Sequence, residues 1–209
     1  MMTGESLTRP SDGVSHQIAT PSGWVNELDS TVEAAWSTLA TSLPAVPFPE
    51  PCRFGGPFES IVFAEAAAQH RTRLSSRADG YGDATRASLH RGFQVSAVDY
   101  LTALDERKRL ADDVDAALDG LDAIVLPGSC CVAPRHHETG IRERLGRFTT
   151  PFSLTGHPVV ALPVPASEGS LPVGDQVVAR RGEDSTAIAV AAQLERAWEG
   201  GQITGARLQ

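Results

Sequence analysis

The segment DAIVLPG, residues 122–128, decides the fold of this chain. Its central residues are all apolar and lack the alternation with polar residues that a half-exposed strand requires. The segment follows a predicted helix over 96–118 and Gly120, which ends that helix. A short apolar run in this position predicts a strand buried on both faces of a parallel or mixed sheet.

Further strands and helices are predicted on both sides of this segment. Apolar runs at 157–165 and 171–180, joined by a turn that contains Gly and Ser, predict two more strands. Periodic apolar positions and helix-end signals predict helices over 30–43, 58–74, 86–92, 96–118 and 184–198. Helices that alternate with apolar strands indicate an α/β fold.

Local signals predict where some of these elements begin and what separates them. Ser30 followed by Glu33 predicts a capping box at the start of the first helix. The stretch PAVPFPEP (44–51) cannot be helical, because its prolines lack the amide donor. Residues 75–83 and the long polar segment 129–147 are predicted to be loops.

Composition and charge exclude several classes of protein. The chain has 209 residues with 41% hydrophobic residues, as in a globular protein. It carries 18 basic against 26 acidic residues, a net charge of -8, so we expect no nucleic-acid partner and no membrane partner. No apolar run approaches the roughly 20 residues of a membrane span, and no signal-peptide pattern opens the chain. We therefore expect a cytoplasmic protein.

The cysteines and histidines form the most suggestive polar cluster. Cys130 and Cys131 lie close in sequence to His136 and His137. Adjacent residues of an extended segment point to opposite sides, so this spacing does not predict a metal site. A thiol nucleophile paired with an imidazole stays an alternative. With Cys52 the chain has three cysteines, which do not form the pattern of a secreted disulfide framework.

Other catalytic and cofactor-binding motifs are absent from the sequence. There is no Gly-x-Ser-x-Gly elbow, no Gly-x-Gly-x-x-Gly and no phosphate-binding loop, so no cofactor is expected. Lys108 is the only lysine, and it lies in the middle of a predicted helix with an acidic surface. Its ammonium should stay protonated at neutral pH and therefore cannot act as a base.

The order of several segments resembles the C-terminal half of the amidase signature family. The segments are IATPSGWVNELDSTVEAAWSTL (18–39), IVFAEAAAQH (61–70), TRASLHRGFQVSAVDYLTALDERKRL (85–110), DAIVLPGSCCVAP (122–134), FTTPFSLTGHPVVALPV (148–164) and LPVGDQVVARRGEDSTAIAVAAQLERA (171–197). The resemblance implies one half-domain over 16–200, between tails at 1–15 and 201–209. It also implies a partial α/β/α sandwich around a mixed, twisted sheet.

The family's reaction is the hydrolysis of a carboxamide C–N bond by two serines and a lysine. The resemblance places this catalytic set, and the glycine-rich stretch that stabilises the oxyanion, in the family's N-terminal half. Nothing in these residues replaces the set, since the only Ser-Ser pair, Ser75-Ser76, lacks the glycine-rich surroundings. We therefore assign no catalytic residue to this chain.

The resemblance implies a substrate-side role for two segments that wall the family's pocket. They contribute the candidate substrate-binding residues Ser129, Cys130, Cys131, Phe148, Thr149, Ser153 and Gly156. Two positions depart from the family pattern. Ser153 stands where asparagine is common, and Asp175 stands where an aliphatic residue is usual.

Three hypotheses on function follow. The first is an amidase half that is inactive alone and takes an amide substrate once a second chain supplies the two serines and the lysine. Association of this chain with further copies of itself, as a homo-oligomer, is another possibility for the same hypothesis. The second is a non-catalytic module that binds a small molecule or serves as a scaffold. The third is a cysteine hydrolase that uses Cys130 or Cys131 with His136 or His137.

Overall fold

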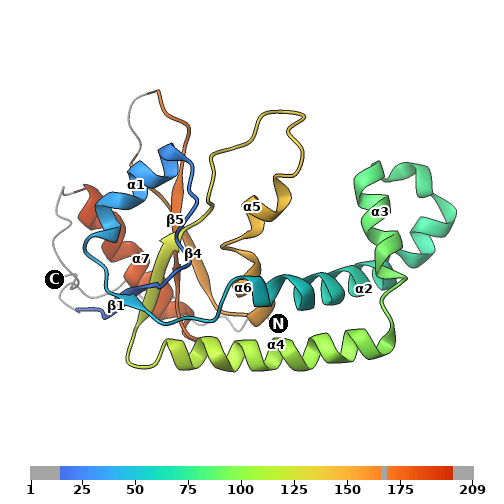
Figure 1. Cartoon of the computed structure of the whole chain (residues 1–209), viewed down its shortest axis with the longest axis horizontal. Helices are drawn as coiled ribbons and strands as arrows, with labels where there is room; N and C mark the ends of the chain where they lie inside the picture. The colour runs from blue at the N-terminus through green and yellow to red at the C-terminus, as the bar shows by residue number, and fades with distance from the viewer. Residues whose placement is uncertain (1–14, 166–168, 200–209) are drawn as a thin grey trace.

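A computed structural model describes residues 15–165 and 169–199. Its core is one five-stranded sheet in the order β2-β1-β3-β5-β4 (Figure 1). The strands are β1 (Ile18–Pro21), β2 (Ala45–Val46), β3 (Ala123–Pro127), β4 (Val159–Pro163) and β5 (Gly174–Val178). β1 runs parallel to β2 and β3, whereas β5 runs antiparallel to β3 and β4. The sheet is therefore mixed, and the predicted α/β class is confirmed.

Strand β3 is the centre of the sheet and is buried along its whole length. Ala123 and Val125 belong to the apolar cluster on one face, and Ile124 and Leu126 belong to the cluster on the other. This is the strand that DAIVLPG predicted. Its burial on both faces explains why the segment shows no polar alternation.

Helices cover both faces of the sheet, which makes an α/β/α arrangement (Figure 1). One face is covered by α1 and α7, and the other by α2, α4 and α6. The helices are α1 (Ser30–Ala40), α2 (Cys52–Ser76), the 3-10 turn η1 (Ala78–Gly80), α3 (Asp83–Gly92), α4 (Ala97–Ala117), α5 (Arg142–Gly146), α6 (Thr150–Thr155) and α7 (Asp184–Glu199). The expected tails lie outside the described residues apart from Ser15.

Helix α2 begins earlier than its sequence predicted. It starts at Cys52 and continues through Pro57, whereas the pattern predicted a start at residue 58. Pro57 has no N–H, so the helix loses one hydrogen bond to the carbonyl of Arg53. Tertiary contacts hold this first turn in place, because Phe54 is fully buried and Arg53 forms ion pairs with α4.

The predicted capping box at Ser30 was wrong. Asp29 is the N-cap of α1, and Ser30 is already the first helical residue. The Asp29 N–H donates to the carbonyl of Cys130 at 2.9 Å, so a contact far along the chain positions the start of this helix. The predicted loop 129–147 also contains one unpredicted helical turn, α5.

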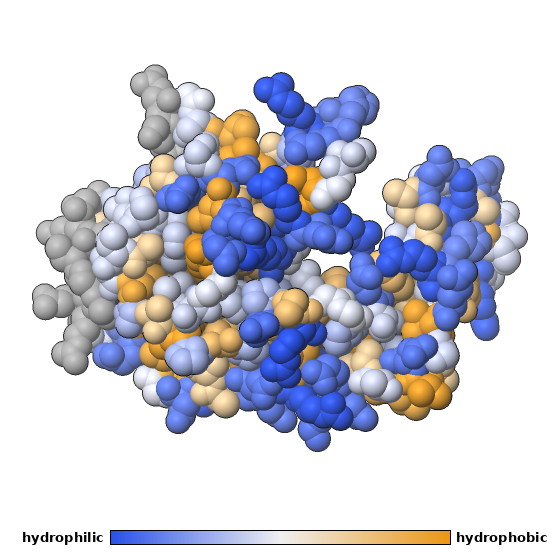
Figure 2. Space-filling view, in the orientation of Figure 1, coloured by the Kyte–Doolittle hydropathy of each residue, from blue (hydrophilic) through white to orange (hydrophobic). Residues whose placement is uncertain are grey.

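Helices α2, α3 and α4 extend as an arm away from the sheet (Figure 1). Val98 and Leu101 of α4 share the helical spacing of buried leucines, yet they are 72% and 60% exposed. Phe93, in the turn between α3 and α4, is also 49% exposed. Figure 2 shows an apolar area at the lower right, on the arm. No helix in residues 15–165 and 169–199 combines the length and apolar character needed to cross a bilayer.

The arm depends on a close approach of α3 to α2 at Gly92. A Cβ atom built on Gly92 would lie 2.0 Å from the carbonyl oxygen of Phe63, a distance that backbone atoms cannot tolerate. Gly55, also helical, would meet nothing within 4 Å.

We predict opposite effects for two alanine substitutions. Gly92→Ala should lower the free energy of unfolding by at least about 2 kcal/mol, because backbone must move to admit the methyl group. Gly55→Ala should raise it by about 0.5–1 kcal/mol through helix propensity. Urea denaturation of both variants measures this, and equal effects would contradict the close packing of α3 on α2.

Candidate functional site

The loop that follows β3 is held in place by Asp29. The Asp29 carboxylate accepts a hydrogen bond from the Val132 N–H at 3.3 Å and forms an ion pair with Arg144 at 2.6 Å. The Asp29 N–H donates to the Cys130 carbonyl. One residue therefore ties the start of α1, the loop at 130–132 and helix α5 together. No local sequence pattern marks Asp29, because its partners lie about 100 residues away.

Both cysteines of this loop are buried. Cys130 and Cys131 are 1% and 5% exposed, and the Cys130 thiol donates to the Arg144 carbonyl at 3.0 Å. Burial raises the pKa of the Cys130 thiol, which disfavours the thiolate that nucleophilic catalysis needs.

The two histidines of the same loop are exposed, unlike these buried thiols. His136 and His137 are exposed and stack on each other, with their ring centroids 4.8 Å apart. No hydrogen bond joins either imidazole to a cysteine in the part of the chain that the structure describes. Within that part no group of His, Cys, Asp or Glu could hold a metal ion. The cysteines here stabilise the loop by their burial.

The candidate residues around α6 divide into a buried anchor and an exposed edge. Phe148 is fully buried, and its carbonyl accepts a hydrogen bond from the buried Gln176 side chain at 2.8 Å. Thr149 and Ser153 are exposed. Gly156 ends α6 with a φ of 77°, a left-handed conformation that glycine adopts without strain.

Within each of the two segments, 129–131 and 148–156, some candidate substrate-binding residues are buried and others are partly or fully exposed. Beside the buried Cys130, Cys131 and Phe148, Ser129 is half-buried and its hydroxyl lies 3.7 Å from the Cys131 sulfur. The candidates that solvent can reach are Ser129, Thr149, Ser153 and Gly156.

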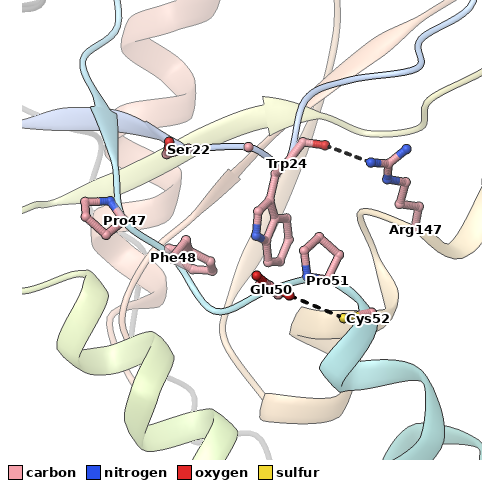
Figure 3. A pocket seen from close by; sticks show the side chains of 9 residues that line it. Ser22, Trp24, Pro47, Phe48, Glu50, Pro51, Cys52 and Arg147 are labelled. Carbon is pink, nitrogen blue, oxygen red and sulfur yellow. Dashed lines mark hydrogen bonds between the residues drawn. The ribbon is translucent and has the colours of Figure 1, made fainter.

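A cavity of about 650 Å³ lies beside these segments (Figure 3). It is lined by Ser22, Gly23, Trp24, Pro47, Phe48, Glu50, Pro51, Cys52 and Arg147. None of the candidate substrate-binding residues belongs to this lining. Arg147 lines the cavity and directly precedes Phe148, one of the candidate substrate-binding residues.

Arg147 joins the cavity to the turn that follows β1. Its guanidinium donates to the carbonyls of Trp24 and Asn26, each at 3.3 Å, and to the Asn26 side chain. It also forms an ion pair with Glu27 at 3.3 Å. Most of its donors are therefore satisfied within the chain, and Glu27 offsets its charge.

The floor of the cavity is formed by packed aromatic side chains. Trp24 is 1% exposed, and its indole N–H donates to the Pro49 carbonyl at 2.8 Å. Its ring stacks on Phe152, with centroids 5.8 Å apart, and meets the edge of Phe48 at 5.0 Å. The sequence alone gave no sign of this cluster, because its members come from three separate segments.

The residues considered for serine–lysine chemistry do not line the cavity. The hydroxyls of Ser75 and Ser76, at the end of α2, both donate to the Thr72 carbonyl. Lys108 is exposed on α4. The only Ser-Ser pair is therefore an ordinary helix end.

Asp175 is a buried carboxyl group in the middle of the sheet. It is 3% exposed, and its Oδ2 atom has no hydrogen-bond partner within the described residues. It lies on β5 opposite Pro127 of β3 and Leu162 of β4. Burial raises the pKa of Asp175 to about 7.

Comparison with known proteins identifies the family. The sequence profile of the family described as Amidase matches residues 30–188. The chain belongs to the amidase family. It is 26% identical over 123 residues to the putative amidase AmiD of Mycobacterium tuberculosis, covering 56% of this chain and 26% of that protein. It is 31% identical over 129 residues to one component of the glutamyl-tRNA(Gln) amidotransferase of Rickettsia bellii, covering 57% of this chain and 26% of that protein.

Solved structures of amidases share the fold. A crystal structure of an amidase matches with a TM-score of 0.80 and 30% identity, covering 93% of this chain and 48% of that one. A 6-aminohexanoate cyclic dimer hydrolase complexed with substrate matches with a TM-score of 0.72 and 20% identity, which shows the fold alone. The chain spans about a quarter of the curated relatives and about half of these solved chains.

We predict that Asp29 rigidifies the loop after β3. Asp29→Ala removes the acceptor of the Val132 N–H and the partner of Arg144, so the free energy of unfolding should fall by about 1–2 kcal/mol. The amides of residues 130–133 should also exchange faster with deuterium. Asp105→Ala, at an exposed position of α4, is the control. Unchanged exchange in the Asp29 variant would contradict this role.

We predict that Asp175 lowers the free energy of unfolding by an amount that depends on pH. The unfolded chain ionises this group near pH 3.8, but the folded chain ionises it only near 7, so stability falls as the pH rises between these values. This pKa shift corresponds to a loss of roughly 4 kcal/mol in the free energy of unfolding above pH 7, relative to low pH.

Asp175→Asn should abolish this fall and be more stable than the parent at pH 8, with little difference at pH 4. Denaturant unfolding at both pH values measures it, with the exposed Asp79→Asn as control. An identical pH profile for Asp175→Asn and the parent would contradict the assignment.

Proposed function

We propose that this chain is the pocket-wall half of an amidase that hydrolyses a carboxamide C–N bond. The two serines and the lysine come from sequence outside these 209 residues, carried by a second polypeptide. The observation that carries the proposal is that 93% of this chain matches a solved amidase but covers only 48% of that amidase. Residues 16–200 act in this proposal as one half-domain. A cytoplasmic location is part of it.

In this proposal the chain contributes one side of the substrate pocket, held in a fixed arrangement. Asp29 holds the loop at 130–132, and Gln176 holds the carbonyl of Phe148. Preorganised walls let an amide bind without the cost of ordering them first. Ser129, Thr149 and Ser153 are the candidate residues whose side chains reach solvent from this wall.

A small-molecule-binding module without hydrolysis is the second candidate, and the cavity supports it. The aromatic floor and the Glu50 carboxylate in the lining suit a compact polar ligand. The cysteine-hydrolase alternative gains no support, because both thiols of the loop are buried.

The test supplies the serine half in trans. That half is an amidase-family segment from the same genome that carries the glycine- and serine-rich stretch and the lysine. We expect no ammonia from a simple amide with this chain alone, and both co-purification and ammonia release when the two are co-expressed. Ammonia release by the pure chain alone would overturn the proposal, as would the absence of both association and hydrolysis.

The same samples separate the second candidate. A binding module would be stabilised by amides or carboxylates without turnover, by about 2.7 kcal/mol at a ligand concentration 100 times the Kd. Thermal unfolding with and without ligand measures this. Stabilisation of the lone chain, with no hydrolysis after addition of the serine half, would favour the module over the amidase half.

A further inference from the structure

The two edges of the sheet differ in a way that bears on assembly. Strand β2, at one edge, has only two residues and lies among Pro44, Pro47 and Pro49. Short edge strands flanked by prolines are how folded proteins prevent unwanted pairing. Strand β4, at the other edge, has five residues, and its segment 157–165 carries no Asp, Glu, Lys or Arg.

The hydrogen bonds of β4 show which of its backbone groups are free. The Val164 N–H donates to the Val173 carbonyl at 3.1 Å, and the Pro158 carbonyl accepts from the Ala179 N–H at 3.2 Å. The even-numbered residues of β4 therefore face β5. Val159, Ala161 and Pro163 turn their backbone groups outward, where β4 has no second neighbour within the described residues.

The side chains of the same residues are also uncovered. Val159 pairs with Val178, which belongs to the cluster beneath α4 and α6, so Val159 and Ala161 lie on that face of the sheet. Val178 is fully buried, whereas Val159 is 41% exposed and Ala161 is exposed. The helices thus cover β5 and leave β4 bare on this face.

We propose that the outer edge of β4 is the surface on which the serine half docks, by adding a strand beside Val159 and Ala161. This inference rests on the proposed function, because it takes the serine half as the occupant. A solved amidase continues well beyond the part that this chain matches, which is 48% of it, and in this proposal the serine half is the equivalent of that remainder. The β4 edge offers both free backbone groups and bare apolar side chains for this docking. Pro163 has no N–H, so pairing through outward donors ends at Ala161.

The free edge is tested first on the lone chain. In residue-resolved hydrogen exchange, the amides of Val159 and Ala161 should exchange at least about 100-fold faster than those of Val160 and Leu162, which face β5. Equal protection of all four in a monomer would mean that this chain covers its own edge, and would overturn the proposal. Equal protection in a dimer would assign the edge to a second copy and overturn it as well.

The docking itself is tested with the co-expressed serine half. Val159→Lys places a charge on the edge, and Ala161→Pro removes one outward N–H, so each should weaken association by about tenfold or more. The matched control is Val98→Lys, the same change at an exposed valine of the arm, with an expected effect below about twofold. Circular dichroism checks that each variant is folded.

The outcomes separate the two proposals. Association that both β4 variants leave unchanged overturns docking at β4, even if the complex hydrolyses amides, and a loss with Val98→Lys alone places the contact on the arm. Association that depends on β4 without any hydrolysis supports the docking surface and overturns the amidase function. Absence of any complex overturns both.

Discussion

The structure depends on one constraint, the burial of β3 on both faces. The polar peptide groups of this strand need partners within the protein, because the strand is buried. β1 pairs in parallel with Ala123 and Ile124, and β5 pairs antiparallel with the residues from Ile124 to Pro127. The side chains of Ala123, Ile124, Val125 and Leu126 alternate between two apolar clusters, so the helices on both faces pack against the same short strand.

Polar anchors at the ends of the strands then place the loops. Gln176 ties the carbonyls of Pro127 and Phe148 together from within the core. His157 links Thr155 to Asp115 of α4, and burial lowers the pKa of His157. Burial alone would raise the pKa of Asp115, but hydrogen bonds from Arg181 and His157 outweigh it and lower that pKa. Such buried bonds are costly to leave unmade, so they give each loop one arrangement.

These anchors matter for the proposed function because the chain supplies walls rather than reacting atoms. A wall contributes to catalysis only if it keeps its shape when the substrate arrives. Asp29 and Gln176 hold that wall by hydrogen bonds, whereas Val159 of β4 and Val98 of α4 expose apolar side chains to water. The same domain therefore anchors the proposed pocket wall by polar contacts and leaves apolar side chains exposed at its periphery.

The sequence by itself determined the α/β class, the central strand, the positions of most helices and the resemblance to amidases, because these follow from local periodicity and from motif order. The tertiary structure alone decided the start of α2 at Cys52, the N-cap at Asp29, the exposure of Val98 and Leu101, and the cavity beside Arg147. Each of these depends on a contact between segments far apart in the chain. Local pattern cannot encode such contacts, since a buried phenylalanine or a distant carbonyl outweighs the propensity of the residues beside it.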